Sequence, residues 1–398
     1  MGHFRRREGN SYECNGMRTR KKEYLTGLRR WFHQYPELAF QEFKTAEHIR
    51  EELDKMNIPY QTVGTGTVAV LSGTSEKPVI GLRCDEDALP ITEVKESPFK
   101  SKHDGCMHAC GHDAHITMLL GAARILSEHR EELNCTIKFI FQPAEEVFGG
   151  AKKMLESGLL DDVDTFCGMH IFPYIPAGKI SVEEGPRYTS ADSMKIKIIG
   201  KSGHGAMPQF SVDPIYVGCQ VVNALQSIAS RETDPVETCV ISVCKFHCGS
   251  LFNVIEESAE LEGTVRTFSP ELRKRLPEII ERVIKNTCSA FRADYEFEYT
   301  FGAPATINDA GCSQIAEKAV KKILGEDGLA LYTKTPGGED FAYMLERRPG
   351  IYAFVGCRNE AQDQCYPLHH KRFDLDEEGM LNGCAFYIQY VLDIQDKI

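Results

Sequence analysis

Residues 136–146 read Thr-Ile-Lys-Phe-Ile-Phe-Gln-Pro-Ala-Glu-Glu, an apolar run that leads directly into a pair of glutamates. Residues 136–141 are mostly apolar or β-branched, which is typical of a strand, and the Gln-Pro pair ends it. Two glutamates, Glu145 and Glu146, follow directly. Carboxylates behind the carboxyl end of a strand in a parallel sheet stand where such folds place their active sites. A solvated glutamate pair in a surface loop is the alternative interpretation.

The chain on both sides of this stretch alternates between helices and strands. Apolar residues at helical spacing predict helices, and short β-branched runs predict strands. Helices are expected at residues 22–35, 43–56, 116–126 and 151–156, and strands at 68–71 and 79–83. Thr45 is expected to cap the second of these helices. The alternation predicts an α/β sandwich with a largely parallel sheet.

The pattern changes beyond residue 190. Strands are expected at residues 194–199, 240–246, 261–268 and 294–299, and helices at 215–231 and 271–291. The order β-α-β-β-α-β forms a self-contained open-faced sandwich of about a hundred residues. Further segments follow at residues 311–324, 351–355 and 377–394. We therefore expect an α/β domain, residues 1–190 and 302–398, interrupted by a smaller α+β domain at 191–301.

The composition is that of a globular protein with an acidic surface. The 398 residues carry a formal charge of −12, which opposes binding to nucleic acid or to an anionic membrane surface. The basic residues 5–7 and 18–22 are interpreted as a solvated terminus. No apolar run approaches the ~18 residues of a membrane span, and residues 1–10 lack the apolar segment of a signal peptide. We expect a soluble, cytoplasmic protein.

Cysteines and histidines are unusually frequent in this chain. The fifteen cysteines are an odd number without small-domain spacing, which argues against a disulfide framework, so most are expected to be reduced and buried. Among the thirteen histidines, His170 follows the apolar residues 166–169, and His369 and His370 precede the last helix. A histidine beside an apolar segment is usually structural, so these residues alone do not establish a metal site.

The stretch with the most potential metal ligands is residues 107–115, Met-His-Ala-Cys-Gly-His-Asp-Ala-His. Cys110 and His112 flank a glycine, so a turn can direct both side chains at one point. A thiolate with an imidazole suits zinc, cobalt or another borderline metal. Asp113 is expected either to cap the following helix or to hold the ring of His112. A polar turn that happens to be rich in histidine is the alternative.

Seven motifs together resemble the M20 metallopeptidase family. The closest branch is the amidohydrolases, which include aminoacylases, hippurate hydrolases and auxin-conjugate hydrolases. The motifs occupy residues 29–38, 82–90, 107–115, 141–146, 203–204, 263–266 and 338–341. They occur in family order and cover nearly the whole chain. The resemblance implies a di-metal catalytic α/β sandwich domain and an inserted smaller α+β domain that serves as a lid and dimerisation domain.

The resemblance also implies a site for two divalent ions of zinc, manganese, cobalt or nickel, in which a cysteine replaces the bridging aspartate of other branches. Carried over position by position, the ligands are Cys110, His112, Glu146, His170 and His369. Glu145 matches the general base that activates a water held between the ions. His370 stands next to the ligand histidine and is the alternative at that position.

Three aspartates and three departures from the family pattern surround these ligands. Asp85, Asp87 and Asp113 are expected to support the ligands by hydrogen bonds. Cys84 stands where relatives usually carry alanine, Glu86 where they carry methionine, and Glu256 where they carry proline. None of these departures removes a ligand. The first two adjoin Asp85 and Asp87.

The inserted domain contributes further candidates by resemblance. His204 matches a histidine that stabilises the tetrahedral oxyanion and often reaches in from a partner subunit, which implies a homodimer through this domain and a lid that closes before chemistry. Asn253 and Arg266 are expected to bind the substrate carboxylate, Arg266 through its bidentate fork. Gly338 would let the backbone approach the acyl group. From the residues alone, a surface turn, a surface ion pair and a plain glycine turn are the alternatives.

The leading hypothesis is a metal-dependent amidohydrolase that cleaves the amide bond of N-acyl amino acids. A dipeptidase or aminopeptidase of the same family is the second enzyme hypothesis. A non-catalytic binding protein on this fold would require loss of a ligand or of the base, and neither is lost. A cysteine hydrolase using Cys110 is a further alternative, and removal of metal separates it from the di-metal mechanism.

Overall fold

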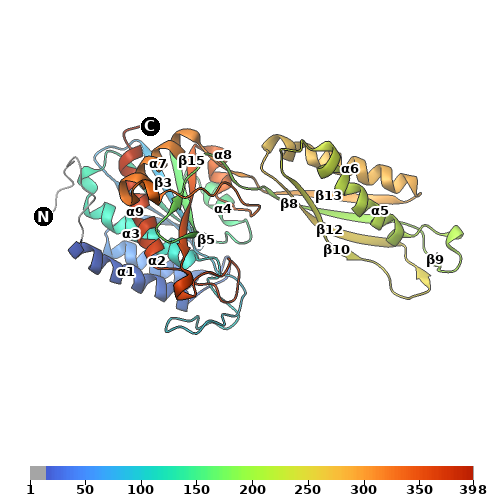
Figure 1. Cartoon of the computed structure of the whole chain (residues 1–398), viewed down its shortest axis with the longest axis horizontal. Helices are drawn as coiled ribbons and strands as arrows, with labels where there is room; N and C mark the ends of the chain where they lie inside the picture. Colours follow the sequence, from blue (N-terminus) through green and yellow to red (C-terminus); the bar gives the residue numbers. More distant parts are fainter. Residues whose placement is uncertain (1–14, 398) are drawn as a thin grey trace. The chain divides into compact units, whose positions relative to one another are not determined.

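The computed structural model describes residues 15–397, which fall into two compact units (Figure 1). The first unit comprises the chain up to Gly185 together with Ile307–Thr333 and the part from Tyr343 onward. The second comprises Pro186–Thr306 and Lys334–Ala342. Of the predicted basic start, residues 5–7 lie outside the described part, whereas residues 18–22 belong to a helix. Within residues 15–397, every helix is too short or too polar to cross a bilayer.

A seven-stranded mixed sheet forms the centre of the first unit, in the order β1-β2-β4-β3-β5-β15-β6. Its strands are β1 (Tyr60–Val63), β2 (Gly66–Ser72), β3 (Val79–Asp85), β4 (Thr136–Gln142), β5 (Thr165–Pro176), β6 (Ile180–Ser181) and β15 (Gly350–Arg358). The four central strands pair in parallel, and the outer strands β1, β2 and β6 join antiparallel. The prediction of a parallel sheet therefore holds for the buried centre, where helices cover both faces.

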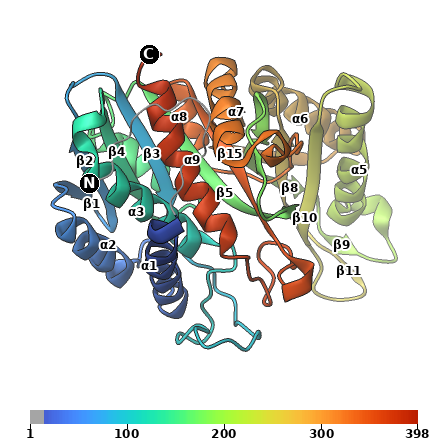
Figure 2. The same cartoon turned by 60° about the vertical axis from the view of Figure 1, so that its left-hand side comes forward.

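Helices pack against this sheet through apolar faces. They are α1 (Asn15–Gln34), α2 (Phe43–Lys55), α3 (His112–Glu128), α4 (Gly150–Glu156), α7 (Ala310–Leu324), α8 (Ala342–Arg347) and α9 (Glu378–Ile394), with short 3₁₀ turns at Arg130–Glu132, Glu326–Gly328 and Glu360–Gln362. Figure 2 shows α3 and α9 side by side over the central strands, and both helices contact β5. The burial of nearly every residue of α3 follows from this central position.

One local prediction about α2 is wrong. Thr45 does not cap this helix, because it lies inside the first turn and is buried. Its backbone N–H and its hydroxyl both donate to Oε2 of Glu37, at 2.9 and 3.0 Å. Glu42 occupies the N-cap position without a capping side-chain hydrogen bond. The carboxylate of Glu37 thus satisfies a first-turn N–H that a threonine cap would otherwise accept.

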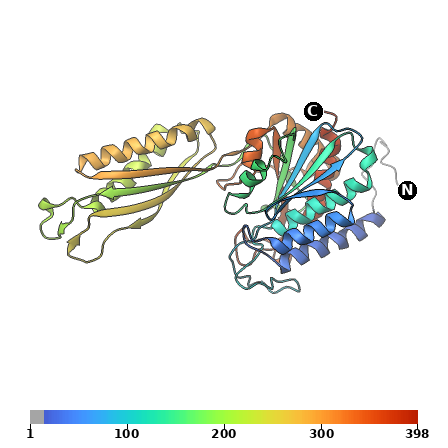
Figure 3. The ribbon, with the colours of Figure 1, turned by 180° about the vertical axis from the view of Figure 1, so that it is seen from behind.

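The second unit is an open-faced sandwich with a four-stranded antiparallel sheet in the order β10-β12-β8-β13. Its main elements are β8 (Ala191–Ile199), α5 (Pro214–Ser227), β10 (Cys239–His247), β12 (Ser258–Thr267), α6 (Pro270–Ala290) and β13 (Asp294–Ala303). This is the predicted β-α-β-β-α-β order. Helices α5 and α6 contact each other and cover one face of the sheet (Figure 3). Along β8 and β13 exposure alternates from residue to residue, as expected of a sheet with one solvated face.

Shorter elements complete the two units. They are β7 (Gly185–Tyr188), β9 (Gly203–His204), β11 (Val254–Ile255), β14 (Thr306–Asn308), a 3₁₀ turn at Pro208–Phe210 and a π-helical turn at Ile228–Glu232 that continues α5. Both long helices of the second unit begin at side-chain caps. Asp213 accepts the N–H groups of Ile215 and Tyr216, and Ser269 accepts that of Leu272. Each cap is followed by proline, which cannot donate and is favoured there.

The register of the central strands gathers chemical groups at one end of the sheet. Asp85 at the end of β3 pairs with Gln142 at the end of β4, so the loop with Glu145 and Glu146 begins beside it. The pairing of β3 with β5 ends at Gly168, and His170 lies two residues beyond. The carboxyl ends of β3, β4 and β5 therefore open onto one place, as expected of a parallel sheet with an active site.

Candidate metal centre

The five predicted ligands, which come from distant parts of the chain, lie together at this end of the first unit. Sγ of Cys110 is 3.3 Å from Nε2 of His170. Oε1 of Glu146 is 3.9 Å from Nε2 of His112 and 3.4 Å from Nε2 of His369. Cys110, His112 and His170 are buried, whereas His369 is exposed. The site therefore has a closed inner side and an open outer side.

Cys110 belongs to two separate groups of potential ligands. Its sulfur lies within 4.8 Å of ligand atoms of His112 and His170, and also within 4.8 Å of those of Glu146 and His369. Gly111 between the two motif residues has φ of 88° and forms the N-cap of α3. Residues with a side chain rarely adopt this left-handed conformation, so glycine makes the turn that directs Cys110 and His112 inward.

The two buried imidazoles, those of His112 and His170, both direct Nε2 toward the centre of the cluster. Nδ1 of His112 lies 2.8 Å from the carbonyl oxygen of Asp87, and Nδ1 of His170 lies 2.5 Å from that of Ile171. A carbonyl only accepts hydrogen bonds, so each Nδ1 carries a proton, and in the neutral ring each Nε2 has the lone pair that a metal would bind. Nε2 of His112 and Oε1 of Glu146 are buried acceptors without a hydrogen-bond partner in the described part of the chain. Such orphaned acceptors fit a bound cation.

The two neighbouring histidines near the C-terminus have different surroundings. His369 approaches Glu146, and its backbone N–H donates to the carbonyl of Ala109 at 2.8 Å. Its φ is 63°, in the left-handed region where residues other than glycine are uncommon. His370 instead stacks on Tyr366 at 4.9 Å between ring centres, and its Nδ1 accepts the N–H of Arg372. The geometry favours His369 over His370 as the ligand.

The electrostatics of the cluster are strongly negative. Burial, together with Glu146 and Glu145, raises the pKa of the Cys110 thiol well above its usual range. Burial alone would lower the pKa of His112, but the Asp85 and Asp87 carboxylates raise it to about 10. The raised pKa values of Cys110 and His112 both reflect an excess of negative charge among buried groups. A divalent cation removes that excess and deprotonates a coordinating thiol.

Asp87 holds the loop that carries the two glutamates. Its Oδ1 accepts the backbone N–H of Glu145 and its Oδ2 that of Glu146, each at 3.0 Å. Its Oδ1 also lies 3.4 Å from Nδ1 of His112. One carboxylate therefore contacts three of the predicted site residues, as would be expected of a residue that supports metal ligands.

Asp85 anchors a buried network between strands. Its Oδ2 accepts from Nη1 of Arg83 at 2.8 Å, and its Oδ1 lies 2.5 Å from Nδ1 of His115. Nε2 of His115 accepts the backbone N–H of Ile171 at 2.8 Å, next to His170. Asp85, His112 and His115 also lie close enough to hold an ion. Both ring nitrogens of His115 already have partners, so this residue ties β3 to β5 instead of binding metal.

The expectation that Asp113 holds the ring of His112 is wrong. Asp113 lies in the first turn of α3, and its Oδ2 contacts Nε of Arg29 at 2.9 Å and Nδ1 of His33 at 2.8 Å. Gly111, not Asp113, is the N-cap of the helix. Asp113 therefore ties α3 to α1, while Asp87 takes the position beside His112. Arg29 lies in the first of the seven motifs, but its sequence pattern does not indicate Asp113 as its partner, because the two residues are 84 positions apart.

The departures from the family pattern have distinct surroundings. Cys84 is fully buried, and burial raises the pKa of its thiol well above the usual range. Glu86 is fully buried, and neither carboxyl oxygen has a hydrogen-bond partner in the described part of the chain. Burial and the charges of Glu42 and Asp87 raise the pKa of Glu86 well above its usual range. Glu256 is half-buried and hydrogen-bonded to Ser250.

The predicted residues of the inserted domain lie in the second unit. His204 is in β9, paired with Val254 of β11, and the N–H of Gly205 donates to the carbonyl of Asn253 at 2.8 Å. His204 and Asn253 are thus brought to one edge. Arg266 is half-buried in β12, and its Nε donates to the Thr264 hydroxyl at 3.0 Å. Gly338 belongs to the segment Lys334–Ala342 of this unit.

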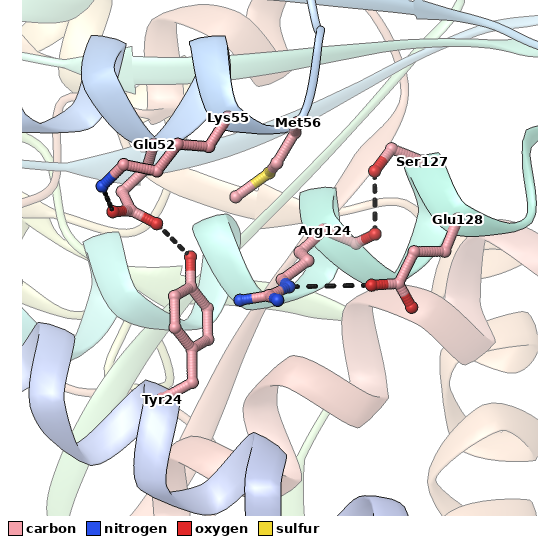
Figure 4. Close-up of a pocket in the computed structure, with 7 residues that line it drawn as sticks. All are labelled: Tyr24, Glu52, Lys55, Met56, Arg124, Ser127 and Glu128. Atoms are coloured by element: carbon pink, nitrogen blue, oxygen red, sulfur yellow. Dashed lines mark hydrogen bonds and ion pairs between the residues drawn. The ribbon is translucent and has the colours of Figure 1, made fainter.

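A pocket elsewhere in the first unit offers no comparable chemistry (Figure 4). It is lined by Tyr24, Glu52, Lys55, Met56, Arg124, Ser127 and Glu128. The Tyr24 hydroxyl donates to Glu52 at 2.6 Å, and Lys55 pairs with the same carboxylate. The charged side chains of this pocket are thus engaged with one another, and none of the predicted site residues lines it.

Comparison with known proteins places this arrangement in a family. Residues 81–393 match the model of peptidase family M20/M25/M40. The chain is 38% identical over 379 residues to N-acetylcysteine deacetylase of Bacillus subtilis, covering 94% of this chain and 97% of that protein. It is 39% identical over 384 residues to IAA-amino acid hydrolase ILR1-like 4 of Arabidopsis thaliana, covering 94% and 87%.

A solved structure agrees with these sequence matches. The YXEP protein of Bacillus subtilis, described as a dinuclear metal binding peptidase from the M20 family, superposes with a TM-score of 0.85 at 36% identity, over 96% of this chain and all of that one. The chain therefore belongs to peptidase family M20/M25/M40, as a metal-dependent amidohydrolase. This confirms the fold class and the family inferred from the seven motifs.

Proposed function

We propose that this protein hydrolyses the amide bond of N-acyl amino acids at a centre of two divalent ions held by five side chains. These are Cys110, His112, Glu146, His170 and His369. The observation that carries the proposal is the position of Cys110, whose sulfur lies in two groups of ligand atoms at once. A thiolate shared between two ions needs such a position, and zinc, manganese, cobalt and nickel all suit the mixed donor set.

Bound at this place, divalent ions would supply Lewis acidity and lower the pKa of a coordinated water toward neutrality. The residues of the chain move the proton. Glu145 lies with Glu146 and His112 in one group of atoms within 4.8 Å, so its carboxylate is within reach of a water at the centre. It takes the proton of the attacking water and returns it to the departing nitrogen. Its backbone is fixed by Asp87, which keeps the carboxylate in place between the two transfers.

His204 is proposed to stabilise the oxyanion of the tetrahedral intermediate. Its Nδ1 accepts the backbone N–H of Ala206 at 3.0 Å, so in the neutral ring the proton sits on Nε2. Nε2 is then a hydrogen-bond donor on an exposed side chain, which is what an oxyanion requires. Asn253, Arg266 and Gly338 are proposed to bind substrate. Burial lowers the pKa of Arg266, yet a guanidinium stays charged at neutral pH and suits a substrate carboxylate.

The substrate class rests on the relatives. By their names, two of them act on N-acetylcysteine and on conjugates of IAA with amino acids. Both substrates are N-acyl amino acids with a free carboxylate. A small N-acyl amino acid or a peptide-like analogue is therefore the proposed substrate, and nucleic acid and membrane are not proposed partners.

A homodimer through the second unit is proposed as the assembled state. Strand β10 is an edge of the four-stranded sheet, which leaves one row of its backbone groups open to a further strand. Large apolar side chains are exposed within residues 207–216 and 246–254 of the same unit, namely Met207, Phe210, Ile215, Tyr216, Phe246, Leu251, Phe252 and Val254. Light scattering would give twice the mass of the 44.7 kDa chain if this proposal holds, and the single mass would refute it.

A cytoplasmic location is also proposed, because Cys110 must stay a reduced thiol to bind metal. Fractionation of cells that express the tagged full chain would test this location. Recovery in an oxidising compartment would contradict it.

The function is tested by metal removal followed by a substrate panel. Thorough chelation should abolish hydrolysis, and manganese, zinc, cobalt or nickel should restore it. The panel contains N-acetyl and N-benzoyl amino acids and dipeptides, and turnover of the acylated compounds is expected to dominate. Hydrolysis that survives chelation would exclude the di-metal mechanism and favour a cysteine hydrolase. Turnover restricted to dipeptides would favour a dipeptidase.

A further inference from the structure

Three consecutive backbone N–H groups, those of Ala144, Glu145 and Glu146, each donate to a buried carboxylate. Asp87 accepts the last two. The first, from Ala144, donates to Oε1 of Glu42 at 2.9 Å. Glu42 lies 102 residues earlier in the sequence, before α2, and outside every motif that defines the site. Two carboxylates, Asp87 and Glu42, therefore hold the loop that carries the proposed base.

The backbone of Ala144 adopts a conformation that needs support from its surroundings. Its φ is 53°, in the left-handed region where residues other than glycine are uncommon. Its carbonyl accepts N–H groups of Gly149 and Gly150 at 3.3 and 3.1 Å, so the loop curls back on itself there. A Cβ on Gly150 would lie 1.6 Å from the carbonyl oxygen of Pro143, which shows how tightly the loop is closed. The direction of the Glu145 side chain depends on this turn.

A glutamate is an unfavourable residue at the buried position of Glu42 if its only role is to fill space. Its side chain is fully buried. Its acceptor atoms are used by N–H and hydroxyl groups: Oε1 also accepts the N–H of Phe40 at 2.9 Å, and Oε2 accepts the hydroxyl of Thr65 at 2.7 Å. Burying a carboxyl without a paired cation is unfavourable, and an apolar side chain of the same size avoids this cost. What the carboxyl adds is an acceptor for three groups, and the N–H of Ala144 is the one that belongs to the loop of the proposed base.

We propose that Glu42 is a positioning residue for the reaction: by accepting the N–H of Ala144 it fixes the turn that directs the Glu145 carboxylate at the reacting water. This inference rests on the proposed role of Glu145 as the base. Misplacement of a catalytic group by about 1 Å can cost about 10²-fold in rate. The effect of losing Glu42 should therefore appear in kcat, while the ligands keep their metal.

A purely structural role at the start of α2 is the competing explanation, and Glu37 provides the matched control. Oε2 of Glu37 accepts the N–H and the hydroxyl of Thr45 in the first turn of α2. Glu37 thus supports the same helix end with two hydrogen bonds, but the backbone N–H groups of residues 144–146 donate to Glu42 and Asp87, not to Glu37. Replacing Glu37 by leucine disturbs the helix end without releasing Ala144.

The test compares Glu42→Leu, Glu42→Asp, Glu42→Gln and Glu37→Leu in the metal-loaded enzyme. Glu42→Leu should lower kcat about 10- to 100-fold at unchanged KM and metal content. Glu42→Asp, which keeps the charge but is one methylene too short to reach Ala144, should show a similar loss and guards against failure to fold. Glu42→Gln should stay within about threefold of the wild type, because its amide oxygen still accepts both N–H groups and the Thr65 hydroxyl can turn round.

Hydrogen exchange gives a readout that does not depend on activity. Peptides that cover residues 143–150 should exchange at least about tenfold faster in Glu42→Leu and Glu42→Asp than in Glu37→Leu. The proposal would be overturned if Glu37→Leu lost as much kcat as Glu42→Leu and Glu42→Asp. It would also be overturned if folded Glu42→Asp kept the wild-type kcat. A wild-type enzyme that fails to hydrolyse any N-acyl amino acid would instead refute the proposed function.

Discussion

The sulfur of Cys110 lies 3.3 Å from Nε2 of His170, although 60 residues separate them in the sequence. Cys110 precedes α3, and His170 lies in β5, where the strand extends beyond its pairing with β3. Burial raises the pKa of the thiol and lowers that of the imidazole, so without a cation the two neutral groups share a hydrogen bond, whereas a divalent cation would take both as ligands. This contact is therefore the point at which loss of metal should be most visible.

Replacing Cys110 by serine should lower metal content and reduce kcat by more than about 100-fold, because a serine hydroxyl stays protonated and cannot act as a shared anionic ligand. Metal analysis of the purified variant and steady-state kinetics with an N-acyl amino acid would measure both effects. Cys106→Ser is the matched control. Its thiol donates to the carbonyl of Pro36, a hydrogen bond that serine can replace, so full activity is expected. Two bound ions in Cys110→Ser would contradict the bridging role.

Glu145→Gln and Glu146→Gln should separate the base from the ligand. Glutamine cannot take a proton, so Glu145→Gln should lower kcat by about 10²–10⁴-fold while both ions stay bound. Glu146→Gln should lower metal content instead, because the amide is a weaker ligand than the carboxylate facing His112 and His369. Full turnover in Glu145→Gln would refute its assignment as base, and unchanged metal content in Glu146→Gln would refute the ligand role.

The order of strands and helices is predictable because it depends on local periodicity. The buried run at residues 136–141 became β4, and the glutamates behind it lie at the carboxyl end of the sheet as expected. Which side chains support the ligands is not local information. Asp113 turned toward Arg29 and His33, and Asp87 took the position beside His112. A carboxylate in a motif shows that a polar partner exists, but only the packing of α1 against α3 decides which partner it is.

The neighbouring residues His369 and His370 also show that local sequence does not decide which side chain reaches the site. The sequence pair His369-His370 offers two imidazoles, and nothing in its pattern distinguishes them. The backbone decides, because φ of 63° at His369 directs that ring at Glu146 while the next ring stacks on Tyr366. Their roles stay predictions, which a pair of substitutions can test.

His369→Ala should reduce the number of bound ions below that of the wild type and lower kcat by more than about tenfold. His370→Ala should leave metal content unchanged and kcat within about threefold, because it loses only a stacked ring and one accepted N–H. Titration with cobalt, followed by its absorption spectrum, would count the sites in each variant. The reverse order of effects would show that His370 is the ligand.

Glu86 offers a prediction about stability. A fully buried carboxyl whose oxygens have no partner within the described residues costs about 1–3 kcal/mol relative to an apolar side chain of similar size. Burial and the charges of Glu42 and Asp87 raise its pKa in the folded protein. A raised carboxyl pKa means that the folded state holds the proton longer than the unfolded state. The contribution of Glu86 to the free energy of unfolding should therefore fall as pH rises from about 4.3 toward the folded-state pKa.

Glu86→Met should accordingly raise the free energy of unfolding by about 1–3 kcal/mol, and the gain should grow with pH by up to about 1.4 kcal/mol per unit within that window. Urea unfolding of both chelated proteins between pH 5 and 8 would measure the difference, in which other titrating groups cancel. Glu86→Gln is the control, since it removes the titration but keeps a buried polar group. Its difference from Glu86→Met should not depend on pH. A gain from Glu86→Met that is the same at every pH would show that Glu86 does not titrate in this range, and a loss of stability would show that its carboxyl has a partner in solution.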